Sequence, residues 1–307
     1  MFSKNSNKTL WIVLVVLIIA VALIFSSEST KNERSFKKDL VSVDTAKVTE
    51  ISLFPKSQHG KEVKLFKVDK TWKVNADNGK QYLVPQSKVE NLFDQLLRIK
   101  PERVAARSKD KWKEYKIDST STRVQVSEGN DKVLDLIIGK FSYQQPRSMS
   151  TYVKLANDND VYEVDGFLDI TFNKDANSFR DESIVVSDKG KWNKLTFDSD
   201  NLNDSFDLVK VDNHWQINGT KTDSAKTEKA LSTLSRITNN SYLNLEKSNF
   251  PNQTSKLTIE VEGGTPITVT AYQDSTNYVI ESSQNPDNYF DGKKVGTKIF
   301  LKKESLF

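Results

Sequence analysis

The chain has 307 residues, and its 45 basic and 41 acidic side chains leave a formal net charge of +4. Aromatic residues make up 10% of the chain and charged residues 28%, values typical of a globular rather than a disordered protein. This small, mixed charge gives no reason to expect a nucleic-acid partner. Because the sequence contains no cysteine, it excludes disulfides, thiolate metal sites and a cysteine nucleophile.

An uninterrupted apolar run extends from Leu10 to Phe25, with hydroxyl residues on both flanks. A run of this length predicts a membrane-spanning helix, because backbone groups in lipid must bond internally. The alternative is a cleaved signal peptide, although only Ser27-x-Ser29 fits a cleavage site, and weakly. We expect residues 1–27 to form a tail and single-pass anchor that contacts the lipid bilayer through residues 10–25. Residues 28–45 are polar and indicate a tether.

Short segments of alternating apolar and polar residues open the next region, residues 46–185. Such alternation predicts half-buried strands of an antiparallel sheet. The predicted strands are 50–54, 63–68, 72–74, 123–126, 133–138, 151–155 and 161–164. The break at Asp69-Lys70-Thr71 suits a hairpin turn.

One helix is predicted between these strands. Ser87-Lys88-Val89-Glu90 has the form of a capping box, and Pro101 closes the segment. The apolar residues recur at helical spacing and predict one buried stripe. They are Val89, Leu92, Phe93, Leu96 and Leu97.

The second region, residues 186–307, repeats this order. The segment from Phe66 to Asn75 reappears from Val209 to Asn218, with Trp72 matched by Trp215. A helix again follows, with Asp223 or Ser224 as its cap. Its predicted buried face is Thr227, Ala230, Leu231, Leu234 and Ile237. The sequence therefore predicts an α+β fold of two tandem modules, each an antiparallel sheet with one main amphipathic helix.

In their order along the chain, several landmarks resemble those of the domain-of-unknown-function family 4340. The resemblance covers residues 48–185 and, more faintly, 190–307. Its landmarks are Phe66 to Asn75, Ser87 to Ile99, Arg103-Val104, Tyr115-Lys116-Ile117, Leu136-Ile137-Ile138-Gly139, Tyr152-Val153, Val161-Tyr162-Glu163-Val164 and Phe179-Arg180-Asp181. The family usually has Tyr-Gly-Leu where this chain has Tyr115-Lys116-Ile117, so that turn is altered here.

The resemblance implies a bacterial envelope protein with one N-terminal membrane helix. Members of the family often occur beside components of ABC-type exporters, including those linked to gliding motility. This association implies a protein of the inner membrane whose bulk is extracytoplasmic, or periplasmic. The basic residues on the two sides of the apolar run nearly balance, so charge alone leaves the orientation open. The family implies no catalytic residue for this chain.

The sequence predicts no catalytic, cofactor-binding or metal-binding residue. His59 and His214 are the only histidines, and they belong to different modules, which argues against a shared zinc site. The acidic segments 157–160 and 198–200 lack the spacing of a calcium loop and suit turns. Gly139-Lys140 lacks the other residues of a phosphate loop and also suits a turn.

One local cluster mixes basic and aromatic side chains. Such a cluster could bind an anionic glycan or another anionic polymer, whereas the simpler interpretation is a solvated loop with its aromatic rings tucked into the module. The residues of this possible interaction patch are Arg103, Arg107, Lys109, Lys111, Trp112, Lys113 and Tyr115, with Lys116 at its end.

The leading functional hypothesis is a non-enzymatic, single-pass scaffold or accessory subunit with protein partners in an envelope complex, such as an ABC-type exporter. A second hypothesis is an envelope hydrolase that uses two carboxylates in a cleft between the modules. A third is a glycan-binding or anionic-polymer-binding module. No cofactor and no nucleic acid are expected.

Overall fold

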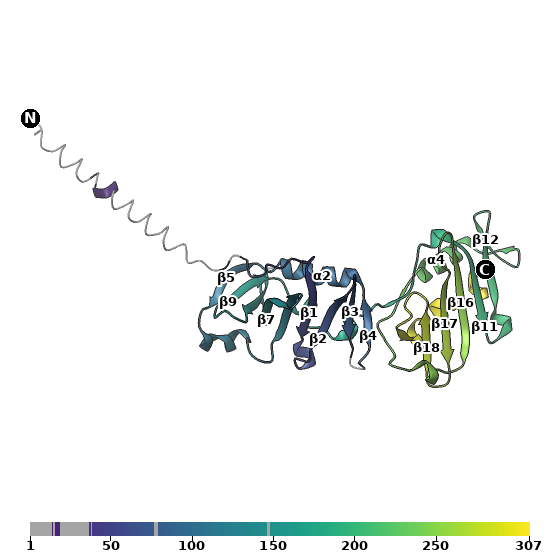
Figure 1. Ribbon diagram of the computed structural model, residues 1–307. Coiled ribbons are helices and arrows are strands. Elements are labelled where there is room, and N and C mark those ends of the chain that lie inside the picture. The colour runs from purple at the N-terminus through teal and green to yellow at the C-terminus, as the bar shows by residue number, and fades with distance from the viewer. Residues whose placement is uncertain (1–13, 15, 19–36, 38, 77–78, 146–147) are drawn as a thin grey trace, which may run out of the picture.

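The structure is a computed structural model that describes residues 14, 16–18, 37, 39–76, 79–145 and 148–307 (Figure 1). The predicted anchor over residues 10–25 falls outside these residues except at 14 and 16–18, and so does most of the predicted tether over 28–45. Among the described residues, no helix has both the length and the apolar character needed to cross a membrane. The predicted transmembrane helix is therefore not supported.

The predicted α+β class is wrong, because the described chain is mostly antiparallel β-sheet. Its strands form sheets of nine, two and eight strands. Among the described residues only two α-helices exceed four residues. They are α2 (Gln86–Leu97) and α4 (Ser224–Leu234), whereas α3 (Asp169–Phe172) and α5 (Gly296–Ile299) are single turns.

The first module is built on the nine-stranded sheet, whose order is β4-β3-β2-β1-β6-β7-β8-β9-β5. The strands are β1 (Val48–Phe54), β2 (Val63–Val68), β3 (Thr71–Asn75), β4 (Gln81–Val84), β5 (Pro101–Ala106), β6 (Thr122–Glu128), β7 (Asp131–Gln144), β8 (Ser148–Leu155) and β9 (Val161–Asp165). Every predicted strand lies within one of these, so the alternation signal is confirmed for the individual strands.

The second module is built on the eight-stranded sheet, whose order is β14-β13-β12-β11-β16-β17-β18-β19. The strands are β11 (Trp192–Ser199), β12 (Phe206–Val211), β13 (His214–Ile217), β14 (Thr220–Lys221), β16 (Gln253–Val261), β17 (Ile267–Gln273), β18 (Tyr278–Ser282) and β19 (Tyr289–Asp291). A separate pair, β10 (Ser183–Val186) with β15 (Arg236–Thr238), completes the strands.

The two large sheets have the same strand order, with β11 in the place of β1 and β16 in the place of β6. They differ after the helix. The strand β5 joins the far edge of the first sheet beside β9, whereas β15 leaves its sheet and pairs with β10. In Figure 1 the modules lie one after the other, and the C-terminus is in the second.

Each module has its own hydrophobic core. The core of the first extends in sequence from Leu40 to Phe179, and that of the second from Ile184 to Leu306. In each, the helix covers one face of the sheet because its apolar stripe points inward. That stripe is Val89, Leu92, Phe93 and Leu96 on α2, and Thr227, Leu231 and Leu234 on α4.

The helix ends differ from the predictions in three places. Pro85 precedes α2 and no side chain caps it, so the predicted capping box at Ser87 does not form. Leu97 is 43% exposed rather than part of the stripe. Asp223 does cap α4, because its carboxylate accepts the backbone N–H of Lys226 at 2.8 Å. Ile237 lies in β15 instead of on the helix.

Candidate functional site

The junction between the modules is a buried, hydrogen-bonded polar site. The chain leaves the first core at Phe179 and enters the second at Ile184. Between them lies Arg180, whose side chain is 1% exposed. A fully buried guanidinium is costly unless its donors find acceptors.

Two asparagines and two tyrosine rings contact the Arg180 guanidinium. Its Nε donates to Asn288 Oδ1 at 2.8 Å, its Nη2 donates to the same oxygen, and its Nη1 donates to Asn177 Oδ1 at 3.0 Å. Its carbon lies 3.5 Å from the ring centroid of Tyr82 and 3.9 Å from that of Tyr242. The two rings come from different modules, so Arg180 is held by both.

Burial determines the electrostatics of this cluster. It lowers the pKa of Arg180, an effect that the neighbouring tyrosines partly oppose, and it raises the pKa of Tyr242. The Tyr242 hydroxyl donates to the Arg180 carbonyl oxygen at 3.2 Å. The buried Arg180 side chain therefore contacts residues of both modules.

Further bonds tie the junction to both sides. The Asp181 backbone N–H donates to the Leu83 carbonyl oxygen on the edge strand β4 at 3.2 Å. On the other side, Asn285 Nδ2 donates to the Asp181 carbonyl oxygen at 2.8 Å. Lys88 Nζ on α2 donates to the Arg180 carbonyl oxygen at 2.8 Å. The modules are therefore joined through backbone and side chains rather than by a loose linker.

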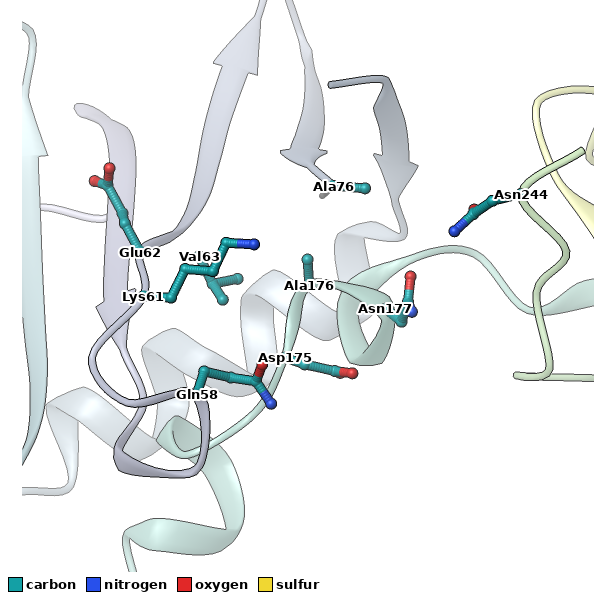
Figure 2. Close-up of a pocket in the computed structure, with 9 residues that line it drawn as sticks. All are labelled: Gln58, Lys61, Glu62, Val63, Ala76, Asp175, Ala176, Asn177 and Asn244. Atoms are coloured by element: carbon teal, nitrogen blue, oxygen red, sulfur yellow. The ribbon is translucent and has the colours of Figure 1, made fainter. Parts of the chain in front are cut away.

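A pocket of about 80 Å³ lies at this junction (Figure 2). Gln58, Lys61 and Glu62 line it from the segment before β2 in the first module, and Asn244 lines it from the second module. The pocket is well below the roughly 300 Å³ at which small-molecule sites begin. Its acids are already engaged, because Glu62 accepts a bond from Ser52 and Asp175 caps the short 3₁₀ helix η3 (Ala176–Phe179).

Where the structure shifts a carboxyl pKa, it lowers it. Hydrogen bonds from side chains and backbone amides lower the pKa of Asp44, Asp110, Asp118 and Asp274. At Asp158 and Asp207 burial raises the pKa, but hydrogen bonds and a lysine neighbour lower it by more, so the pKa of each carboxyl is lowered overall. These shifts favour ionised carboxylates, whereas the predicted hydrolase requires a general acid with a raised pKa. In the same described residues, no cluster of three or more acidic or histidine side chains could hold a metal ion.

The predicted basic cluster lies on the back of the first sheet, on the face away from α2. Three of its six charges meet acids: Arg103 pairs with Glu163, Arg107 Nη1 lies 3.2 Å from Asp160 Oδ2, and Lys111 Nζ lies 3.0 Å from Glu114 Oε1. Lys109 Nζ lies 5.7 Å from the Trp112 ring centroid, and Lys113 is exposed. Binding of an anionic ligand here stays a prediction.

The two aromatic residues of that cluster point inward. Trp112 Nε1 donates to the Asn159 carbonyl oxygen at 3.0 Å, and the buried ammonium of Lys154 lies 4.3 Å from its ring centroid. Tyr115 packs 4.6 Å from the ring of Tyr152 and donates to the Ala105 carbonyl oxygen. Together with Ile117 they form a small second core against the sheet.

Gly139 makes this back-face cover possible. A Cβ there would lie 2.3 Å from the Tyr115 carbonyl oxygen, so only glycine lets the segment cross β7 this closely. The sequence interpretation of Gly139-Lys140 as a turn is wrong, because both residues lie inside β7, at a change of register between Ile138 and Phe141.

A continuous apolar surface lies at the turn end of the β7–β8 hairpin. Tyr143 and Met149 are directly opposite each other, and the Phe141 ring lies 4.5 Å from that of Phe167. These four residues, which we call the hairpin surface, are 36–53% exposed: Phe141 36%, Phe167 39%, Met149 47% and Tyr143 53%. The corresponding hairpin of the second module closes instead in a polar turn, where Asp274 Oδ1 accepts two backbone N–H groups at 2.7 Å.

The repeated tryptophans have different surroundings. Trp72 is 3% exposed and meets the Phe93 ring edge-on, with centroids 6.1 Å apart. Trp215 is only half-buried and lines a pocket of about 540 Å³ together with His214, Lys210 and Leu231. Trp72 therefore belongs to the first core, whereas Trp215 is only partly buried against the second.

The two histidines and the acidic segments noted in the sequence lie in separate elements. His59 ends the short 3₁₀ helix η1 (Lys56–Gln58) in a left-handed conformation, and His214 begins β13. Asp158 accepts bonds from Tyr162 and two backbone N–H groups, and Asp200 accepts one from the Asn201 backbone. These acids therefore organise turns, as the sequence indicated.

Sequence reasoning missed the junction cluster. The Phe179-Arg180-Asp181 landmark was visible in the sequence, but the acceptor Asn288 and the ring of Tyr242 lie far along the chain. The available signal was an arginine beside an aromatic residue at a module boundary.

A family model described as Domain of unknown function (DUF4340) matches residues 72–258, which extends from β3 of the first sheet into β16 of the second. No curated protein and no solved structure matches the chain.

Proposed function

Because the chain belongs to the DUF4340 family, we propose that it is an accessory subunit that binds a protein partner outside the cytoplasm. Members of this family often occur beside components of ABC-type exporters, and this association favours an exporter subunit as that partner. The proposal concerns binding rather than catalysis.

The observation that carries the proposal is the hairpin surface. Phe141, Tyr143, Met149 and Phe167 form one contiguous apolar area. Exposed patches of this kind mark interaction sites, and tyrosine, phenylalanine and methionine are enriched in protein interfaces. A polar rim adjoins it, since Asp169 near Phe167 pairs with Lys56 and Asp165 is exposed. An apolar centre with a polar rim suits a protein partner.

The hydrogen-bonded junction between the modules supports the same proposal. Arg180 and its bonds fix the second module relative to the first, so a partner bound at one module meets the other in a fixed position. Fixed geometry favours binding, because loosely joined modules would lose more entropy when a partner orders them.

Site-specific photo-crosslinking in cells tests the proposal. A photoreactive amino acid at Tyr143 is expected to give one discrete adduct that contains an exporter subunit. The same amino acid at Ser275, exposed in the hairpin turn of the second module, serves as the matched control and is expected to give none. Met149→Asp should abolish the adduct, because it places a charge in the centre of the surface.

Two results would overturn the proposal. The first is the absence of any Tyr143 adduct while the protein is folded and abundant. The second is an adduct formed only with another copy of the same chain, which would make the hairpin surface a dimer contact. Protease access to intact cells tests the proposed extracytoplasmic location separately.

A further inference from the structure

The pocket beside Trp215 exists in the second module because smaller residues surround the tryptophan there. In the first module the eighth residue of α2 is Phe93, which covers the Trp72 ring. The eighth residue of α4 is Leu231, which is buried but lacks a ring. The strand residue opposite Trp72 is Val84, whereas Thr222 takes that place beside Trp215. The indole therefore keeps an uncovered surface.

Lysine and histidine side chains line the pocket beside this surface. Lys210 is directly opposite Trp215 in the β12–β13 register, so the two side chains share one face of the sheet. Lys210 and His214 both line the pocket, and among the described residues neither has an ion-pair partner. Lys189 on the facing wall is already paired with Glu228. Asp188 also lines the pocket, and its carboxylate accepts the Gly190 backbone N–H at 2.9 Å. Two lysines and two acids therefore balance in the lining, and Lys210 is the lysine that keeps no ion-pair partner among the described residues.

The remaining lining is rich in hydrogen-bonding groups. Ser224 opens α4, where helix-terminal N–H groups point outward, and Asn213 lies in the β12–β13 turn with a positive φ of 62°. Charged and hydroxyl groups are depleted from the centres of protein interfaces. One flat apolar wall among many polar groups suits a sugar ring, whose C–H face is apolar and whose rim carries hydroxyls.

We propose that the pocket beside Trp215 binds a sugar residue that carries a carboxylate or a phosphate. The sugar ring stacks on the Trp215 indole, and its anionic group pairs with the Lys210 ammonium. Ser224 and Asn213 bond the hydroxyls. A volume of about 540 Å³ accommodates one such residue with solvent access for an attached chain. The site is independent of the hairpin surface and of the partner bound there.

Calorimetric titration of the full chain tests the inference with three probes: an oligogalacturonate, the corresponding neutral galacto-oligosaccharide and galactose 6-phosphate. At least one anionic probe is expected to bind, and the neutral sugar at least about tenfold more weakly, because it lacks the charge-assisted bond. Binding of the carboxylate but not the phosphate sugar, or the reverse, identifies the anionic group. Failure of both anionic sugars, or equal binding of the neutral one, overturns the proposal.

Single substitutions test whether the sugar binds beside Trp215. Leu231→Phe restores the ring found in the first module and should abolish binding by covering Trp215. Lys210→Glu should reduce affinity by about tenfold or more, as expected for replacing an attractive charge with a repulsive one. Lys67→Glu is its matched control, because Lys67 is directly opposite Trp72 in the first module. Trp215→Ala provides a second test if Leu231→Phe fails to fold. Equal affinities in Lys210→Glu and Lys67→Glu would place the ligand elsewhere.

Discussion

The two modules share a strand order but differ in what covers their sheets. In the first, the segment between β5 and β6 crosses the back of the sheet and packs Trp112 and Tyr115 against it. In the second, the segment between β15 and β16 runs along β19 instead, where Tyr242 bridges to Phe290. That path is what brings Tyr242 to Arg180. The strand framework is thus the shared part, and the covering segments are where the modules specialise.

Replacement of the equivalent tryptophans is expected to give the largest difference. Trp72→Ala should cost about 3–5 kcal/mol of unfolding free energy, because it empties a filled core position beside Phe93. Trp215→Ala should cost only about 1 kcal/mol, because the ring already faces a pocket. Urea unfolding of both variants measures the difference. Equal losses would mean that the two tryptophans are packed alike.

Arg180→Met addresses the connection between the modules. It removes the donors to Asn288 and Asn177 and the cation between two tyrosine rings, so we expect a loss of about 3 kcal/mol. In scanning calorimetry the variant should show two separated unfolding transitions, whereas the two modules of the unmodified protein should unfold more nearly together. Arg236→Met is the control, since Arg236 is exposed. If the two variants unfold identically, Arg180 does not couple the modules.

Gly139→Ala tests the back-face cover that only the first module has. The added Cβ would meet the backbone oxygen of Tyr115, so we expect a loss of about 2 kcal/mol. Gly264→Ala in the second module is the control, because its Cβ would meet nothing closer than 3.5 Å. Thermal unfolding measures both. An unchanged midpoint for Gly139→Ala would show that the segment does not cross β7 this closely.

The smallest expected effect concerns acid stability. Burial raises the pKa of Asp158, but the Asp160 amide, the Tyr162 hydroxyl and Lys37 lower it more. A folded-state pKa below the unfolded value gives stability that is present above about pH 4 and is lost as the pH falls through the folded value.

Asp158→Asn should therefore cost about 1 kcal/mol at pH 7. The difference in unfolding free energy between the variant and the unmodified protein should disappear below about pH 4. Asp207→Asn in the second module should show a smaller gap, because that carboxylate is more exposed. Unfolding measured from pH 7 to pH 3 compares them, and a constant gap across this range would contradict the assignment.

Local patterns predicted the strands because each strand buries one face. The segment 63–68 matches β2 residue for residue. The strand β7 was cut short at Ile138, because Gly139 and Lys140 look like a turn when the segment that crosses them is unknown. Ile237 continued the helical period past Ser235, where α4 has already ended.

The candidate sites were less predictable, because distant residues create them. Nothing near Arg180 in the sequence reveals Asn288 or Tyr242 as its partners. The prediction of an α+β class gave too much weight to two segments with clear helical periodicity in a chain dominated by strands. The prediction that Trp72 and Trp215 occupy equivalent strand positions was correct. It did not reveal the pocket, which depends on Leu231 in the place of Phe93.

Hydroxyl-radical footprinting of the intact chain, read by mass spectrometry at each tryptophan, tests the difference between the modules most directly. The structure predicts rapid oxidation of Trp215 and protection of Trp72, which is 3% exposed. Addition of the anionic sugar should then protect Trp215 and leave Trp72 unchanged. Equal oxidation of the two tryptophans in the free protein would contradict an open pocket in the second module and a sealed core in the first.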